Sequence, residues 1–200
     1  MGTLKTTNIQ SISGSGTVTL GTSGETFAAG SGVTIGSGLG KILQVVQTAF
    51  NANTLYDAGT NTWGEITEMR TSITPSSTSN KILVMPSICF GLEDDSQPIF
   101  KLQRDSTDIS IGNTYSGGAR QGTFACYPRG GSESLSVMTA TFNFLDSPSS
   151  TSSVRYELWL NNRGTSAKET RLNAPQSYTS WGDANASGLT STMTLMEVAG

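Results

Sequence analysis

Side chains that commonly carry out chemistry are scarce in this sequence, because histidine is absent from its 200 residues. Catalytic triads built on serine or cysteine use an imidazole as the base, and many zinc sites use it as a ligand, so these classes are excluded. Glycine is frequent, at 23 residues, yet no phosphate-binding loop occurs, since Gly40 and Lys41 precede Ile42 where serine or threonine is required. We expect no enzyme activity, no cofactor and no metal ion.

Paired carboxylates could still hydrolyse a glycosidic bond if two of them faced each other across a cleft. The candidates lie in an acidic run, around an expected hairpin and on an expected strand: Glu93, Asp94, Asp95, Asp105, Asp108 and Glu157. Carboxylates in turns are usually solvated or accept hydrogen bonds from the backbone, so we do not expect catalysis from them. The acidic run could also hold a calcium ion, but the spacing of an EF-hand is absent, and we expect a solvated loop.

Exposed aromatic residues are the remaining functional signal, because these rings combine a flat apolar face with a polar group and can stack on sugars. Candidate contacts to a ligand or receptor lie in or beside turn-rich segments: Trp63, Tyr127, Tyr178 and Trp181. The same rings could instead fill subunit contacts or close the ends of a β-sandwich. Trp159 alternates away from the apolar residues of its strand, and we interpret it as a subunit-contact residue or part of a second packed face.

The composition restricts the partners. Only 14% of residues are charged, the formal net charge is −3 and basic residues form no patch, so nucleic acid is a poor candidate partner. The apolar stretches are too short to span a membrane, and Met1–Gln10 lacks the apolar core of a signal peptide. Cys89 and Cys126 suit either a disulfide between neighbouring strands or two buried free thiols, and we favour free thiols.

Apolar alternation from Lys41 onward predicts the strands that position these side chains. We expect strands at 41–48, 66–74, 81–92, 99–104, 108–111, 123–127, 135–145, 154–160 and 191–198. Turn residues separate them, as in Asn161-Asn162-Arg163-Gly164, and Pro86 indicates an edge position or a bulge. About eight strands in about 160 residues predict an all-β fold: a two-sheet antiparallel β-sandwich of jelly-roll type, forming a head domain at 41–200.

Residues 1–40 differ in composition from the rest, with many Gly, Ser and Thr residues and isolated apolar ones. Gly14–Gly21 resembles Gly30–Gly36, and each unit contains two alternating apolar side chains. One such strip buries too little surface to fold alone, so we expect an extended β arm that anchors the chain and is ordered in a homotrimer. A flexible linker is the alternative. In the trimer, five residues are expected to pack against the same residues of the other two chains: Val18, Leu20, Phe27, Val33 and Ile35.

Five stretches resemble virion structural proteins of tailed bacteriophages, particularly phages of marine bacteria and cyanobacteria. In chain order, these five landmarks are Gly40–Gln47, Thr74–Val84, Arg104–Ile109, Leu145–Pro148 and Ser191–Val198. Each stretch alone consists of ordinary turn and strand residues, and the resemblance rests on their order along 40–200.

The resemblance implies a trimeric β-sandwich head, a location in the virion after assembly in the host cytoplasm, and a role as a tail fibre or head appendage. It leads to the hypothesis of a tail-fibre-like protein that is joined to other virion proteins by residues 1–40. Its head would then contact a glycan or protein of the host cell surface. The alternative is a capsid decoration or head-fibre protein with a purely structural role.

Overall fold

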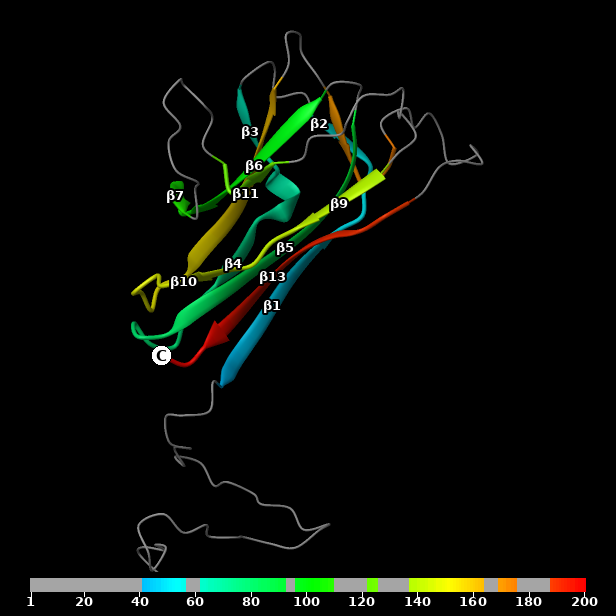
Figure 1. Cartoon of the computed structure of the whole chain (residues 1–200). Coiled ribbons are helices and arrows are strands. Elements are labelled where there is room, and N and C mark those ends of the chain that lie inside the picture. The colour runs from blue at the N-terminus through cyan, green and yellow to red at the C-terminus, as the bar shows by residue number, and fades with distance from the viewer. Residues whose placement is uncertain are drawn as a thin grey trace, which may run out of the picture. The chain divides into compact units, whose positions relative to one another are not determined.

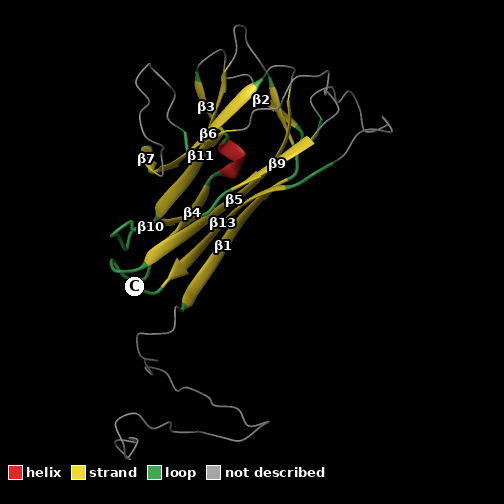
Figure 2. Cartoon of the chain, in the orientation of Figure 1, coloured by secondary structure: helices red, strands yellow, loops and turns green. Residues whose placement is uncertain are grey.

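The alternating apolar residues form two antiparallel sheets in the computed structural model, which describes residues 41–56, 62–92, 96–109, 122–125, 137–163, 169–175 and 188–200 (Figure 1, Figure 2). All of these residues belong to one unit, Gly40–Gly200. The expected arm lies outside the described residues, so the division into an arm and a head stays a prediction.

The first sheet, called sheet A below, contains seven of the described strands. They are β1 (Ile42–Phe50), β2 (Thr54–Tyr56), β5 (Lys81–Leu92), β9 (Val137–Thr141), β10 (Phe144–Asp146), β12 (Thr170–Leu172) and β13 (Ser191–Val198). β5 is central, because Ser87 pairs with Thr192 of β13 on one side and with Thr141 of β9 on the other. β1 pairs with β13, and β2 pairs with β12. Both β12 and β13 pair with β5, so the short strand β12 continues the line of β13, and the short strand β2 continues the line of β1.

The second sheet, called sheet B, contains six of the described strands. They are β3 (Trp63–Glu65), β4 (Thr71–Ile73), β6 (Gln97–Arg104), β7 (Thr107–Ile109), β8 (Phe124–Ala125) and β11 (Val154–Arg163). The 3-10 helix η1 (Thr67–Met69) separates β3 from β4. β11 and β6 are paired along eight residues in the centre, with β3 and β4 on the outer edge of β11 and with β7 and β8 on the outer edge of β6.

Some of the described strands lie end to end along one line, so each sheet has four strand positions side by side among the described residues. Their order is β1/β2, β13/β12, β5 and β10/β9 in sheet A, and β3/β4, β11, β6 and β7/β8 in sheet B. Except between β6 and β7/β8, successive segments of the chain cross from one sheet to the other, and the last strand of the chain, β13, lies beside the first, β1. This is the arrangement of an eight-stranded jelly roll. The predicted all-β sandwich is therefore confirmed, whereas the trimer stays a prediction.

The core lies between the two sheets and is built from the inward side chains of both. Phe90 of sheet A and Phe100 of sheet B meet across it, with ring centroids 5.3 Å apart. Phe100 also stacks on Phe124, at 4.6 Å between centroids. Truncating a fully buried phenylalanine to alanine typically costs about 3–5 kcal/mol, so this aromatic contact is a large part of what holds the sheets together.

Of the two predicted positions for Pro86, an edge or a bulge, the edge is wrong, because β5 is the central strand. The backbone groups of Cys89 point toward the β13 side. Backbone direction alternates along a strand, so the nitrogen of Pro86 faces β9 and β10. Pairing on that side is interrupted at 142–143, between the two strands and opposite the proline. A gap in the neighbouring strand therefore accommodates the missing N–H donor.

Two other strand predictions need correction. The segment expected as a strand at 66–74 contains η1 and only the short β4, because Met69 turns inward and donates its N–H to the carbonyl of Ile66 at 3.0 Å. Three residues of the turn expected at Asn161–Gly164 belong to a strand instead, since β11 continues to Arg163, and Gly164 lies outside the described residues. Asn162 is buried there and accepts a hydrogen bond from Thr170 Oγ1 at 2.9 Å.

Cys89 is a free thiol on the outward side of β5, where its Sγ lies 3.4 Å from Thr139 Oγ1. It is half-buried, which differs from the buried position expected. Cys126 lies outside the described residues. A search of the described segments for a helix long and apolar enough to cross a membrane finds none.

Candidate functional site

One of the predicted contact residues, Trp63, lies within the described part of the chain, on β3. The others lie outside the described residues: Tyr127, Tyr178 and Trp181. The predicted oligomerisation residues of the arm also lie outside them: Val18, Leu20, Phe27, Val33 and Ile35.

Trp63 is part of a surface on the outward side of sheet B that we call the tryptophan face. Its members are Trp63, Lys101, Asp108, Glu157 and Trp159. They alternate with inward residues of the same strands, as the pleat of a sheet requires. Trp159 and Lys101 are paired across β11 and β6, and the Nζ atom of Lys101 lies 4.8 Å from the ring centroid of Trp63 and 5.4 Å from that of Trp159. One ammonium group therefore contacts both indoles, at distances typical of cation–π interactions.

The position of Lys101 is fixed by a second set of contacts. Its Nζ atom lies 2.9 Å from Asp108 Oδ1, and the same oxygen accepts a hydrogen bond from Gln103 Nε2 at 2.6 Å. Burial by itself would raise the pKa of Asp108, but the hydrogen bonds from Gln103 and Lys101 lower that pKa below its ordinary value. Asp108 is therefore ionised at neutral pH and holds the ammonium group beside the two rings.

Glu157 orients the second indole. Its carboxylate is buried and forms an ion pair with Arg155. It also accepts a hydrogen bond from Trp159 Nε1 at 3.4 Å. The rings of the tryptophan face are thus held by charged neighbours that are already paired with one another.

Buried amide atoms without hydrogen-bond partners lie on the same outward side of sheet B. They are Oε1 of Gln97, Oε1 of Gln103, and both Oδ1 and Nδ2 of Asn161. Asn161 is the cross-strand partner of Trp63. A buried polar group that lacks a partner costs about 1–3 kcal/mol. The remaining atom of this kind among the described residues is Oγ1 of Thr71, so unused hydrogen-bonding capacity is concentrated beside the tryptophan face.

The tryptophan face has the features of a surface that binds polyhydroxylated ligands. Half-buried indoles offer flat apolar surfaces, and the carboxylate of Asp108, whose side chain is 39% exposed, can accept hydrogen bonds from hydroxyl groups. Within the described segments, no cluster of Cys, Asp and Glu residues could hold a metal ion. The sequence named Trp63 as a candidate contact but did not indicate Lys101 or its pairing with Trp159. The available signal was the outward alternation of Arg155, Glu157 and Trp159 along one strand.

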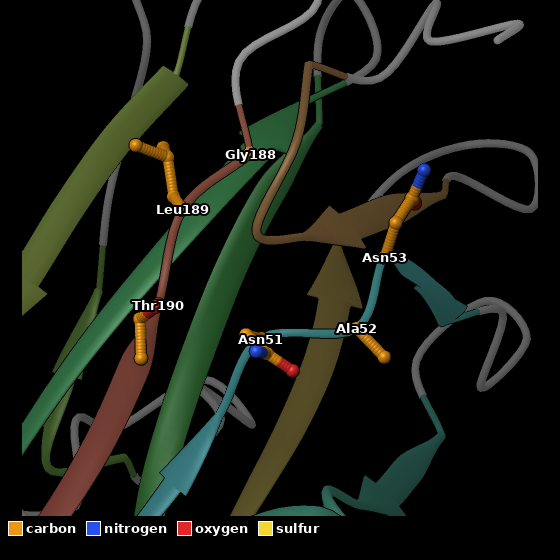
Figure 3. A pocket seen from close by; sticks show the side chains of 6 residues that line it. All are labelled: Asn51, Ala52, Asn53, Gly188, Leu189 and Thr190. Atoms are coloured by element: carbon orange, nitrogen blue, oxygen red, sulfur yellow. The ribbon is translucent and has the colours of Figure 1, made fainter. Parts of the chain in front are cut away.

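A second candidate is a recess of about 720 Å³ at the interruption between β1 and β2 (Figure 3). Its lining comes from that turn and from the segment that leads into β13: Asn51, Ala52, Asn53, Gly188, Leu189 and Thr190. Asn173 fixes both segments, because its Nδ2 donates to the carbonyl oxygens of Phe50 and Ala52 at 2.9 and 3.0 Å, and its Oδ1 accepts from Ser191 Oγ at 2.7 Å. The described lining has amides and a hydroxyl but no aromatic ring, which makes it the weaker candidate for a ligand site.

Three of the five sequence landmarks meet at Glu197, which is 1% exposed. Its Oε2 accepts from Gln44 Nε2 at 2.6 Å, and its Oε1 accepts from Asn80 Nδ2 at 2.6 Å and from Ser76 N at 2.7 Å and Oγ at 2.8 Å. Burial alone would raise the pKa of Glu197, but the hydrogen bonds from Asn80, Gln44 and Ser76 outweigh it and lower the pKa to about 2. This carboxylate ties the β4–β5 turn to β1 and β13.

The other two landmarks meet at Asp146. Arg104 Nη1 donates to Asp146 Oδ1 and Oδ2 at 2.8 and 2.6 Å, and the hydroxyl of Tyr156 donates to Oδ2 at 2.6 Å. Burial, together with the bond to Asp146, raises the pKa of Tyr156. In the same hairpin, Asp105 Oδ1 accepts from the N–H of Arg155 at 2.9 Å. The landmark residues therefore form hydrogen bonds and an ion pair between strands of the sandwich, and in this structure they stabilise the fold.

No protein-family model matches the sequence, and no curated protein matches it. Among solved structures, the chain is similar to one described as the structure of infectious bursal disease virus, Gx strain, with a TM-score of 0.37 and 10% sequence identity. The match covers 78% of this chain but 39% of that one, so the chain spans about two fifths of the length of that relative. A likeness of this size carries no argument about function.

Proposed function

We propose that this protein is a tail-fibre-like structural protein of a bacteriophage virion, whose head attaches the particle to a glycan of the host cell surface. The virion assignment rests on the ordered resemblance of the five landmarks. The attachment role rests on one observation, the pair of half-buried indoles at Trp63 and Trp159 that both contact Lys101. The proposal involves no catalytic step.

The ligand that this surface fits is a sugar chain. An indole stacks on the apolar face of a sugar ring, while the partly exposed carboxylate of Asp108 accepts hydrogen bonds from its hydroxyl groups. A surface with two rings gives weak binding at one site. Several heads on one particle would raise the overall avidity without any new contact, which suits attachment to a repetitive polysaccharide.

The test is binding of the purified full-length protein to an array of bacterial surface polysaccharides. We expect binding that falls at least tenfold in the double variant Trp63→Thr/Trp159→Thr, because tryptophan anchors commonly contribute 2 kcal/mol or more at interfaces (~2 kcal/mol is about 30-fold). The double variant Asn51→Ala/Thr190→Ala, which alters the recess, serves as the matched control and is expected to bind normally. Binding that is lost only in the recess variant would reject the tryptophan face as the site.

The second candidate function is that of a capsid decoration or head-fibre protein. It is favoured by the exposed apolar side chains on the outward side of sheet A, such as Val45 and Leu145, which suit packing against another protein. Copy number separates the two functions. A quantified gel of purified particles would give a few copies for each fibre in the first case and hundreds of copies for each capsid in the second.

A further inference from the structure

The outward side of sheet A carries a continuous apolar row. Cross-strand register places one residue from each of the four strand positions in it: Val45, Met196, Leu83 and Leu145. Val45 is 54% exposed and Leu145 is 48% exposed. Inward neighbours such as Val84 and Leu195 belong to the core, so the alternation of the strands directs the whole row away from the sandwich.

The row lies at one end of the sheet and has a clear limit. Ile42 and Leu43 extend it at the start of β1, where both are exposed. In the other direction the outward residues become mainly polar: Gln47 donates to Thr194 Oγ1 at 2.7 Å, with Met85 as the next cross-strand partner. The row beyond consists of Ala49, Thr192, Ser87 and Thr141. Scattered exposed apolar residues are normal on proteins, whereas a contiguous row of this kind marks an interaction surface.

We infer that this apolar row is a self-association surface, on which the head of a second copy of the chain packs. The four residues of the row carry no charge, and the exposed Lys81 lies in the adjacent cross-strand row with Ile42 and Val198. None of the buried unpartnered polar atoms of the described residues lies on sheet A. The row therefore offers apolar complementarity alone, which an identical row satisfies.

The edge of the sheet supports the same occupant. Within the described residues, β1 pairs with β13 on one side, and its other edge has no strand partner. β1 has nine residues without a proline, and such edges pair readily with another chain. The most exposed apolar residues of the face lie on this edge strand.

The size of the face predicts how strong the association is. The apolar row with its extension covers four strand positions about 4.8 Å apart and residues 42–46 of β1 at about 3.3 Å each, which gives a face of roughly 300 Å². Stable interfaces bury about 800 Å² on each partner, and transient ones bury less. The face alone therefore supports a reversible, concentration-dependent association of the heads.

Analytical ultracentrifugation of the full-length chain over a hundredfold range of concentration tests the inference. We expect wild-type association, and an association constant at least tenfold lower in Val45→Thr/Leu145→Thr. Both substitutions are at exposed strand positions, where threonine is well tolerated, and thermal melting checks that the variant folds. Leu55→Thr is the control, because Leu55 is 39% exposed at the far end of sheet A, beyond the polar rows.

Two results would overturn the inference: a wild-type chain that is monomeric at every concentration, or a row variant that associates as the wild type does. If the row instead binds a segment of its own chain, the protein stays monomeric and the row variant melts at a lower temperature. Loss of glycan binding in the tryptophan variants would leave this result unchanged, since the two faces belong to different sheets.

Discussion

Replacing Glu197 by glutamine is expected to lower the free energy of unfolding by about 2 kcal/mol at pH 7. Glutamine keeps the shape of the side chain but loses the charge, and its NH2 group would face donors now served by a carboxylate oxygen. The fall from an ordinary pKa of 4.5 to about 2 corresponds to about 3 kcal/mol, at 1.36 kcal/mol for each pH unit. Glutamine keeps one oxygen that can still accept part of these hydrogen bonds, which reduces the expected effect to about 2 kcal/mol.

The pH dependence provides the sharper part of this prediction. The folded-state pKa of Glu197 is depressed, so its contribution is fully present above the ordinary pKa of 4.5 and is lost as the pH falls toward about 2. The difference in stability between the wild type and Glu197→Gln is therefore expected to be constant between pH 7 and about pH 5.5 and to shrink by pH 3. Other carboxylates with lowered pKa values, such as Asp108, affect both proteins equally.

Urea denaturation followed by circular dichroism at pH 7, 5 and 3 measures this difference. With an m-value of about 2 kcal/mol/M, the midpoint at pH 7 is expected to fall by about 1 M. Glu65→Gln is the control, because the ion pair of Glu65 with Arg70 lies at the surface and is expected to contribute less than about 1 kcal/mol. A loss below 0.5 kcal/mol at pH 7, or an equal loss at pH 7 and pH 3, would refute the role given to Glu197.

Two further stability predictions follow from buried polar contacts. Tyr156→Phe removes the hydroxyl that donates to Asp146 and is expected to cost about 1–2 kcal/mol in urea denaturation, with a cost near zero contradicting the link. Asn173→Gly and Asn173→Ala both remove the hydrogen bonds from the side chain to the carbonyl oxygens of Phe50 and Ala52. The φ of Asn173 is 59°, in the left-handed region that glycine adopts with less strain than alanine. The alanine variant is therefore expected to be about 1 kcal/mol less stable than the glycine variant, and equal thermal stabilities would contradict this strain argument.

The fold was predictable because its long strands alternate strictly. Lys81–Leu92 was predicted with the bounds that the structure gives, since every second residue is buried in the core. The short strands β2, β3 and β12 were not predicted, because three residues carry too little pattern and are held by pairing with distant neighbours. The turn assigned to Asn161–Asn162 was wrong for a related reason: asparagine favours turns locally, but pairing with β6 keeps these residues in β11.

The candidate site was only partly predictable. Trp63 was identified by its residue type, whereas its neighbours Lys101 and Trp159 come from strands that are far apart in the sequence and become adjacent only in sheet B. The five landmarks were noticed as a resemblance. Their physical role, as donors and acceptors around Glu197 and Asp146, became apparent from distances that no sequence pattern contains.

A fluorescence titration of the full-length protein with bacterial surface polysaccharide tests the central claim most directly. The chain has three tryptophans, and two of them, Trp63 and Trp159, form the tryptophan face. We predict a saturable change in tryptophan emission that disappears in Trp63→Thr/Trp159→Thr, a variant that keeps Trp181 as a reporter. An unchanged response in that variant, or no response of the wild type to any polysaccharide that the protein binds, would contradict the claim that this face recognises the host surface.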